Sequence, residues 1–200
     1  MGQIIHRHTG TVLYTNNQPT LRDTVLHEAR TGASLAYAQL GGIDLSQANL
    51  RFVNFNGAQL PYAYLEGTDF EGATFIDTDL SHANLREANL TRANLHRADL
   101  RSATLRGAAL TGANLTFAEL TDADFTDTEL TGADFGGTDI IGLLHRVGSP
   151  HGENPVTKKK GRYAPKTETV RDPHAYCNYV GTCVANLVDP TIRRCHSKRV

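Results

Sequence analysis

A leucine, phenylalanine or isoleucine occupies every fifth position from Leu35 to Ile140 without a break. These 22 positions hold sixteen leucines, five phenylalanines and one isoleucine. The position two residues earlier is small or β-branched: alanine in sixteen units, threonine in four, and Ile43 and Val53 in the other two. A period of five matches neither the 3.6-residue period of a helix nor the two-residue period of a strand. This register constrains the fold more than any other feature of the chain.

Within each five-residue unit, the two apolar positions alternate with polar ones, as they do in a short β-strand. The other positions are rich in Thr, Asn, Asp and Gly, which favour turns, so each unit is expected to be a brief strand followed by a bend. One unit cannot bury its own apolar side chains, whereas stacked units share a continuous apolar column and pair their backbones. The pattern therefore predicts a solenoid. A long helix is disfavoured, because apolar residues five apart would spiral around its surface.

Residues 81–100 have the sequence SHANLREANLTRANLHRADL. This stretch resembles the pentapeptide-repeat family, whose unit is A-(D/N)-L-x-x, and the resemblance extends over about residues 33–142. It implies the fold of that family, a right-handed quadrilateral β-helix with four pentapeptides in each square coil. Residues 20 positions apart would then stack directly, and the chain would form an all-β solenoid of about 22 pentapeptides.

Residues 1–32 are predicted to form an N-terminal cap, because an open end of a solenoid exposes unpaired backbone and core side chains. Apolar runs on either side of an early His-Thr-Gly turn indicate a short hairpin. A helix over about 20–31 is expected next, since Thr20 and Asp23 form a weak capping box and Gly32 would end it. The alternative to a cap is that residues 1–32 form a separate functional domain. The apolar face of the helix comprises Leu21, Val25, Leu26 and Ala29.

Residues 143–200 follow the repeats and are predicted to be largely irregular. Apolar residues within 140–147 either close the last coil or form a homodimer contact, and the sequence leaves both open. A basic linker rich in Pro, Gly and Lys comes next. All three cysteines, Cys177, Cys183 and Cys195, lie in the final segment, so no disulfide framework supports the repeats. Their spacings match no standard zinc finger, and neither a metal site nor a cofactor site is predicted.

The net charge of the chain, −1, conceals two regions of opposite charge. Residues 31–142 contain 6 basic and 15 acidic side chains, whereas residues 143–200 contain 11 basic and 4 acidic ones. We predict that the acidic surface of the repeats binds another protein. Its candidate residues are Asp79, Asp99, Glu119, Asp122, Asp124, Asp127, Glu129, Asp134 and Asp139. The first three and the last of these would form one vertical column of carboxylates if residues 20 apart stack.

Five arginines within one predicted coil would encircle the solenoid, and we call them the arginine belt. Stacking would place Arg97 over Asp77, and it would place Arg86 in one column with Glu66, so part of the belt would form ion pairs between coils. A second basic cluster, in the tail, offers contacts to phosphates or to an acidic partner. For both charged surfaces the alternative is a solvated wall without a partner. The candidate basic contacts are Arg86, Arg92, Arg97, Arg101 and Arg106 in the belt, and Lys158, Lys159, Lys160 and Arg162 in the tail.

No glycine-rich phosphate loop, nucleophile elbow, HExxH motif or paired-carboxylate motif occurs in the sequence, so catalysis is not expected. No apolar stretch approaches the roughly 20 residues of a membrane span, and a cytoplasmic protein is expected. The family resemblance implies one specific partner class, because some members resemble B-form DNA in shape and charge and bind type II topoisomerases, DNA gyrase or topoisomerase IV. The prediction is a rigid, non-enzymatic protein-binding surface. The alternative is a scaffold or tether whose basic tail binds nucleic acid or an acidic partner. Direct binding of nucleic acid is expected only through that tail.

Overall fold

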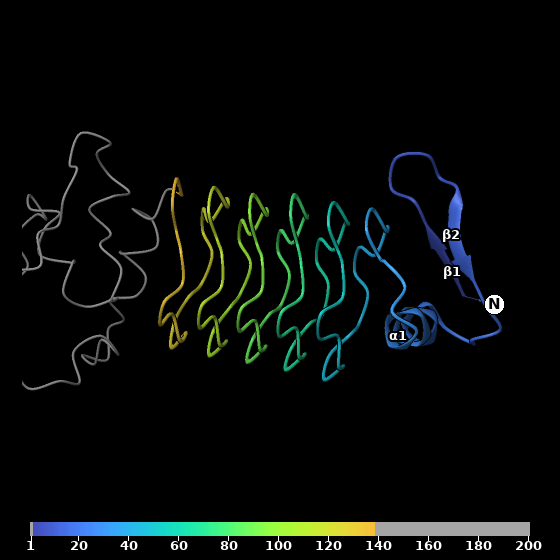
Figure 1. Cartoon of the computed structure of the whole chain (residues 1–200), viewed down its shortest axis with the longest axis horizontal. Coiled ribbons are helices and arrows are strands. Elements are labelled where there is room, and N and C mark those ends of the chain that lie inside the picture. The colour runs from blue at the N-terminus through green and yellow to red at the C-terminus, as the bar shows by residue number, and fades with distance from the viewer. Residues whose placement is uncertain (1, 139–200) are drawn as a thin grey trace, which may run out of the picture.

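The computed structural model describes residues 2–138, which form a shaft of stacked coils with a hairpin and a helix at one end (Figure 1). The predictions made for residues 139–200 lie outside the described residues, among them those on Asp139, the basic linker and the cysteines. Three regular elements precede the shaft: strand β1 (Gln3–Ile5), strand β2 (Val12–Thr15), which pairs antiparallel with β1, and helix α1 (Leu21–Arg30).

Parallel backbone bridges between residues 20 apart hold the coils together. They run from the pair Gln39–Gln59 to the pair Asn114–Asp134. Stacking at 20-residue intervals, and with it the predicted solenoid, is confirmed. The last predicted unit ends beyond the described residues, so the count of 22 units stays a prediction. Each coil has four bridged sides, and we name each side by its first bridged residue: the Gln39, Asp44, Asn49 and Asn54 sides.

The corner between two sides is a β-turn. The amide of Ala38, for example, donates to the carbonyl of Leu35 at 3.2 Å, and the same bond from residue i+3 to residue i recurs along the shaft. The second central residue of each turn has a positive φ, which is 58° at Tyr37 and 66° at Gly72. A positive φ at this position is typical of a type II turn, which favours glycine there. Only eight of the 21 described corners hold glycine, so thirteen other residues adopt a backbone conformation that costs L-residues energy.

The interior of the shaft is filled by the leucine or phenylalanine of each unit, and these side chains are buried along most of its length. Phe55 and Phe75 lie one coil apart, and their stacked rings have centroids 5.2 Å apart. Where threonine replaces the small alanine, its buried hydroxyl requires an acceptor. Thr68 donates to the carbonyl of Leu45 at 2.8 Å, and Thr78 donates to that of Phe55 at 2.8 Å. Threonine is therefore accommodated in the alanine position without an unpaired polar group.

Helix α1 begins and ends close to the predicted positions. At its start, the hydroxyl of Thr20 accepts from the amide of Asp23 at 3.0 Å and donates to the carboxylate of Asp23 at 2.6 Å. At its end, Gly32 has a φ of 78°, and the amide of the following residue donates to the carbonyl of Glu28 at 3.0 Å. This is a Schellman motif, in which glycine adopts the left-handed conformation. The predicted apolar face packs inward, with Val25 fully buried.

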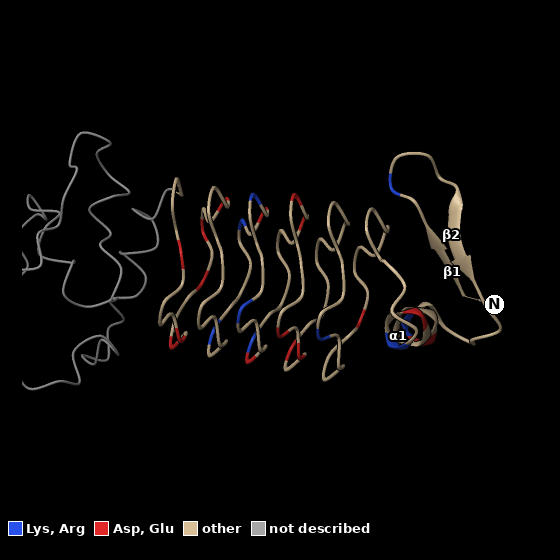
Figure 2. Cartoon of the chain, in the orientation of Figure 1, with Lys and Arg blue, Asp and Glu red and all other residues tan. Residues whose placement is uncertain are grey.

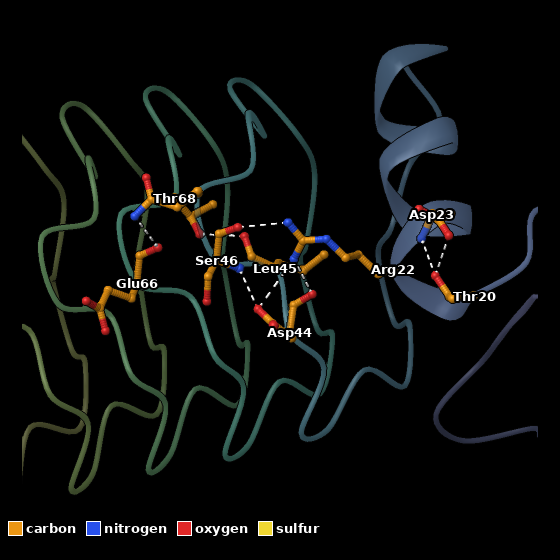
Figure 3. A network of polar contacts seen from close by, with 9 residues as sticks. Thr20, Arg22, Asp23, Asp44, Leu45, Ser46, Glu66 and Thr68 are labelled. Carbon is orange, nitrogen blue, oxygen red and sulfur yellow. Dashed lines mark hydrogen bonds and ion pairs between the residues drawn. The ribbon is translucent and has the colours of Figure 1, made fainter.

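The hairpin and α1 both contact the first coil (residues 34–53). The amide of Gln39 donates to a carbonyl of β1 at 2.9 Å. From α1, the guanidinium of Arg22 extends to the coil and donates to the carbonyls of Asp44 at 2.6 Å and Ser46 at 2.8 Å (Figure 3). These bonds satisfy backbone groups of the first coil that have no preceding coil to pair with.

Candidate protein-interaction surface

The predicted column of carboxylates lies along the Gln39 side of the shaft. Backbone bridges join Gln59 to Asp79, Asp79 to Asp99, and Asp99 to Glu119, so three of its four predicted members stack in successive coils. The carboxylate of Asp79 accepts hydrogen bonds from the amide of Ser81 at 3.0 Å and from its hydroxyl at 2.7 Å. One oxygen of Asp79 therefore stabilises the local turn.

Arg101 lies between the other two carboxylates of the column. Its guanidinium donates to Asp99 at 2.9 Å and 2.5 Å, and its Nε lies 3.3 Å from a carboxylate oxygen of Glu119. Partial burial raises the pKa of Asp99, but the hydrogen bonds and the charge of Arg101 outweigh it and hold this pKa below its ordinary value. The same contacts raise the pKa of Arg101. The column is thus partly neutralised and is not a continuous row of free negative charge.

The remaining described carboxylates surround the shaft near the end of the described residues. Bridges place Glu119, Asp124, Glu129 and Asp134 on the Gln39, Asp44, Asn49 and Asn54 sides in turn. Residues 115–134, which span one coil, contain six carboxylates and no lysine or arginine. Negative charge therefore encircles one coil rather than following one face of the shaft. We define this acidic band as Glu119, Asp122, Asp124, Asp127, Glu129 and Asp134.

The arginine belt lies on the coil before the acidic band, and charges of both signs follow each other along the shaft (Figure 2). The predicted pair between Arg97 and Asp77 is formed, with Nε 2.7 Å from the carboxylate. Arg106 lies 3.6 Å from Asp127 of the acidic band. Arg86 makes no ion pair within residues 2–138, and the carboxylate of Glu66 accepts instead from the side-chain amide of Asn84 at 3.1 Å. The pairing predicted for Arg86 is wrong, because Asn84 reaches that carboxylate.

A set of exposed aromatic side chains on the shaft was not predicted from the sequence. Most of them occupy the corner position with positive φ, which directs the side chain into solvent. The Tyr62 ring stacks on His82 one coil later, with centroids 4.7 Å apart. The signal available in the sequence was an aromatic residue at the corner position of a unit, where most units hold small or polar residues. These aromatic residues are Tyr37, Phe52, Tyr62, Tyr64 and Phe117.

Two hollows mark the described surface. One, of about 390 Å³, is lined by His96, Arg97, Phe117 and Glu119. The other, of about 370 Å³, lies between α1 and the first coil. In the first hollow, titratable groups do not converge as they would around a reacting atom, since Arg97 is paired with Asp77 outside it. Among residues 2–138, no three His, Cys, Asp or Glu side chains are grouped so that they could hold a metal ion.

The family model for pentapeptide repeats matches the chain in eight copies, within residues 31–67, 68–107, 78–116 and 108–142. These segments cover more than half of the 200 residues. The chain is a pentapeptide-repeat protein. This agrees with the bridges between residues 20 apart and with the resemblance of residues 81–100. No curated protein matches the chain.

Solved pentapeptide-repeat structures resemble the shaft. HetL, which is involved in the regulation of heterocyst differentiation in the cyanobacterium Nostoc sp. strain PCC 7120, is 35% identical, with a TM-score of 0.51. The alignment covers 52% of this chain and 49% of HetL, so this chain spans about half the length of HetL. The protein alr5209 of Nostoc PCC 7120 is 28% identical, covering 61% of this chain and 89% of that one, with a TM-score of 0.35.

QnrB1, a plasmid-mediated fluoroquinolone resistance protein, is 26% identical over 55% of this chain and 56% of its own, with a TM-score of 0.34. At TM-scores of this size the likeness to QnrB1 and alr5209 carries no argument about function. Within the described residues, the pentapeptide-repeat protein contains no helix with the length and apolarity that a bilayer crossing requires.

Proposed function

We propose that this pentapeptide-repeat protein is a non-catalytic binding module whose acidic band engages a basic surface of another protein. The observation that carries the proposal is the composition of one coil, in which six carboxylates and no lysine or arginine fall within residues 115–134. Electrostatic complementarity of this kind accelerates encounter with a basic partner and selects against acidic ones.

The fold suits such a role because the carboxylates are carried on a rigid support. The core side chains Leu115 and Leu120 beneath the band are 0% and 4% exposed. The amides of Asp124, Glu129 and Asp134 each donate to the preceding coil at 2.9 Å. Binding a partner therefore costs this protein little conformational entropy, which is the advantage of a preorganised surface.

A type II topoisomerase is the specific partner that we propose, on the basis of the family resemblance. A surface that resembles DNA requires negative charge along the whole length that contacts a basic groove. Charge on this shaft is interrupted by the arginine belt, so the acidic band is the stretch that would enter such a groove. The test is a DNA gyrase supercoiling assay, with and without a fluoroquinolone. Unchanged activity and drug sensitivity at micromolar protein would exclude the topoisomerase partner.

The broader proposal is tested by capturing partners with the full-length protein as bait. A variant with the substitutions Asp127→Asn, Glu129→Gln and Asp134→Asn removes three exposed charges of the acidic band and keeps the size of each side chain. The matched control, Asp44→Asn with Asp77→Asn and Glu87→Gln, removes three exposed charges from other coils. A partner retained by the control and lost by the band variant supports the proposal, and the retention of every captured partner by both variants refutes it.

A further inference from the structure

The first coil of a solenoid has backbone groups that would bond to a preceding coil, and on three of its four sides at least one of these groups is bonded. The carbonyl of Ser34 accepts from the hydroxyl of Tyr14 at 2.8 Å. The amide of Gln39 donates to β1, and the carbonyl of Asp44 accepts from Arg22 at 2.6 Å (Figure 3). Each of these partners comes from the hairpin, from α1 or from the segment between them.

The fourth side, which begins at Asn49, is open. Within residues 2–138, neither the amide nor the carbonyl of Asn49 has a hydrogen-bond partner, and the carbonyl of Arg51 also lacks one. The next coil shows what belongs there: the amide of Asp69 donates to the coil above at 2.9 Å, and the carbonyls of Asp69 and Glu71 accept from it at 2.8 Å and 3.0 Å. One pentapeptide strand is therefore missing above Asn49, and its three backbone bonds are available.

The space for that strand is the groove of about 370 Å³ between α1 and the first coil. This volume lies within the range of about 300–1,000 Å³ that is typical of ligand sites. Its floor is apolar, and two of the floor residues, Ala48 and Val53, are each 7% exposed, whereas most core positions are fully buried. An apolar side chain of an added strand would cover them. The apolar residues that line the groove are Leu26, Ala29, Ala48 and Val53.

The polar rim of the groove is basic. Arg30, in the last turn of α1, is exposed and forms no ion pair with any described residue. Arg22 and Arg51 also line the groove, although they are paired with Asp44 at 3.4 Å and with Glu71 at 2.7 Å. A carboxylate on the added strand would pair with Arg30, and a lysine or arginine there would be repelled by all three.

We propose that this groove binds an extended segment of a partner protein, which adds as a parallel strand above Asn49. The segment carries one large apolar residue, whose amide donates to the carbonyl of Asn49, and at least one acidic residue beside it, which pairs with Arg30. This is β-strand addition, in which backbone bonds give affinity and the side-chain pockets give specificity. The site is distinct from the acidic band. The groove selects an acidic segment, whereas the acidic band selects a basic surface.

The probe is a fluorescent peptide with the sequence of residues 67–72, Gly-Thr-Asp-Phe-Glu-Gly, which forms this side in the second coil. Binding to the full-length protein is measured by fluorescence anisotropy. Two matched peptides separate the contributions: one is N-methylated at phenylalanine and cannot donate to Asn49, and the other replaces the acidic residues with Asn and Gln. We expect both changes to weaken binding by about tenfold or more, because each removes one of the proposed contacts.

The protein variants are Arg30→Glu and, as a matched control, Arg92→Glu. Both arginines are exposed and lack an ion pair within residues 2–138, but Arg92 lies on a distant corner. Arg30→Glu should weaken binding by about tenfold while Arg92→Glu leaves it unchanged, with thermal melting confirming that both fold. The backbone amide of Asn49 should shift in NMR spectra on titration of the peptide.

Three outcomes would overturn the proposal. The first is the absence of peptide binding at millimolar concentration, and the second is equal binding of all three peptides. The third is a dimer in analytical ultracentrifugation that the peptide dissociates, because a second copy of the chain would then be the occupant of the groove.

Discussion

The ring of Phe52 lies across Gly72, which occupies the same corner one coil later. A Cβ added to Gly72 would lie 2.6 Å from Cδ1 and Cε1 of Phe52, a distance that carbon atoms do not tolerate. An exposed aromatic side chain is thus packed on the bare backbone of a glycine in the following coil. Two further pairs of residues have the same arrangement: Tyr37 with Gly57, and Phe117 with Gly137.

Replacing Gly72 with alanine should therefore destabilise the shaft for two reasons, the contact with Phe52 and a φ of 66°. We expect a loss of about 2–4 kcal/mol in the free energy of unfolding, measured by chemical denaturation. Gly112→Ala is the control, because Gly112 has the same φ of 66° but its nearest neighbour would be an ordinary 3.7 Å away. That variant should lose only about 1–2 kcal/mol. Equal losses would show that Phe52 does not contribute.

Arg22→Ala should loosen the first coil. It removes the hydrogen bonds to the carbonyls of Asp44 and Ser46 and leaves both groups without their charged donor. The expected loss is about 1–3 kcal/mol, because hydrogen bonds to charged groups contribute more than neutral ones. Hydrogen exchange of amides in residues 34–53 should accelerate. Arg22→Lys should not restore protection. The planar guanidinium of arginine donates from two nitrogens to two separate carbonyls, and a single ammonium group does not reproduce that geometry. Unchanged exchange in Arg22→Ala would contradict this account.

Arg101→Gln should change how Asp99 responds to acid. The pKa of folded Asp99 lies below its ordinary value of about 3.8, so the ionised carboxylate stabilises the fold above that pH. This contribution is lost as the pH falls through the lower, folded pKa. The substitution removes the side-chain hydrogen bonds and the charge of Arg101, so the pKa of Asp99 should rise, which an NMR titration of the carboxyl carbon would detect. Arg92→Gln is the control and should leave the titration of Asp99 unchanged. An unaltered titration in Arg101→Gln would refute the assigned cause.

The shaft could be predicted from the sequence because one local rule is repeated. An apolar residue at every fifth position fixes which side chains face inward, and a coil of four units then fixes which residues stack. The bridges from Asp79 to Asp99 and on to Glu119 follow from this arithmetic. Helix α1 was also predictable, because Thr20 and Gly32 are terminal signals that act within a few residues.

The charge pattern could be predicted only in part. Counting by twenty identified the column of carboxylates, but it did not show that Arg101 extends along the same side to neutralise Asp99 and Glu119. A flexible side chain has several possible partners within reach, and residue spacing alone does not determine which of them it contacts. The hydrogen bond from Asn84 to Glu66 is an example. The open edge at Asn49 was also hidden, because it depends on where the hairpin and α1 lie against the first coil.

The central claim is that the acidic band binds a basic protein surface. The most direct measurement is the dissociation constant for a captured partner, determined by calorimetry at several salt concentrations. For Asp127→Asn with Glu129→Gln and Asp134→Asn, we predict binding weaker by about tenfold or more, with a reduced dependence on salt. The control Asp44→Asn with Asp77→Asn and Glu87→Gln should bind like the unmodified protein. Equal affinity and equal salt dependence of all three proteins would contradict the claim.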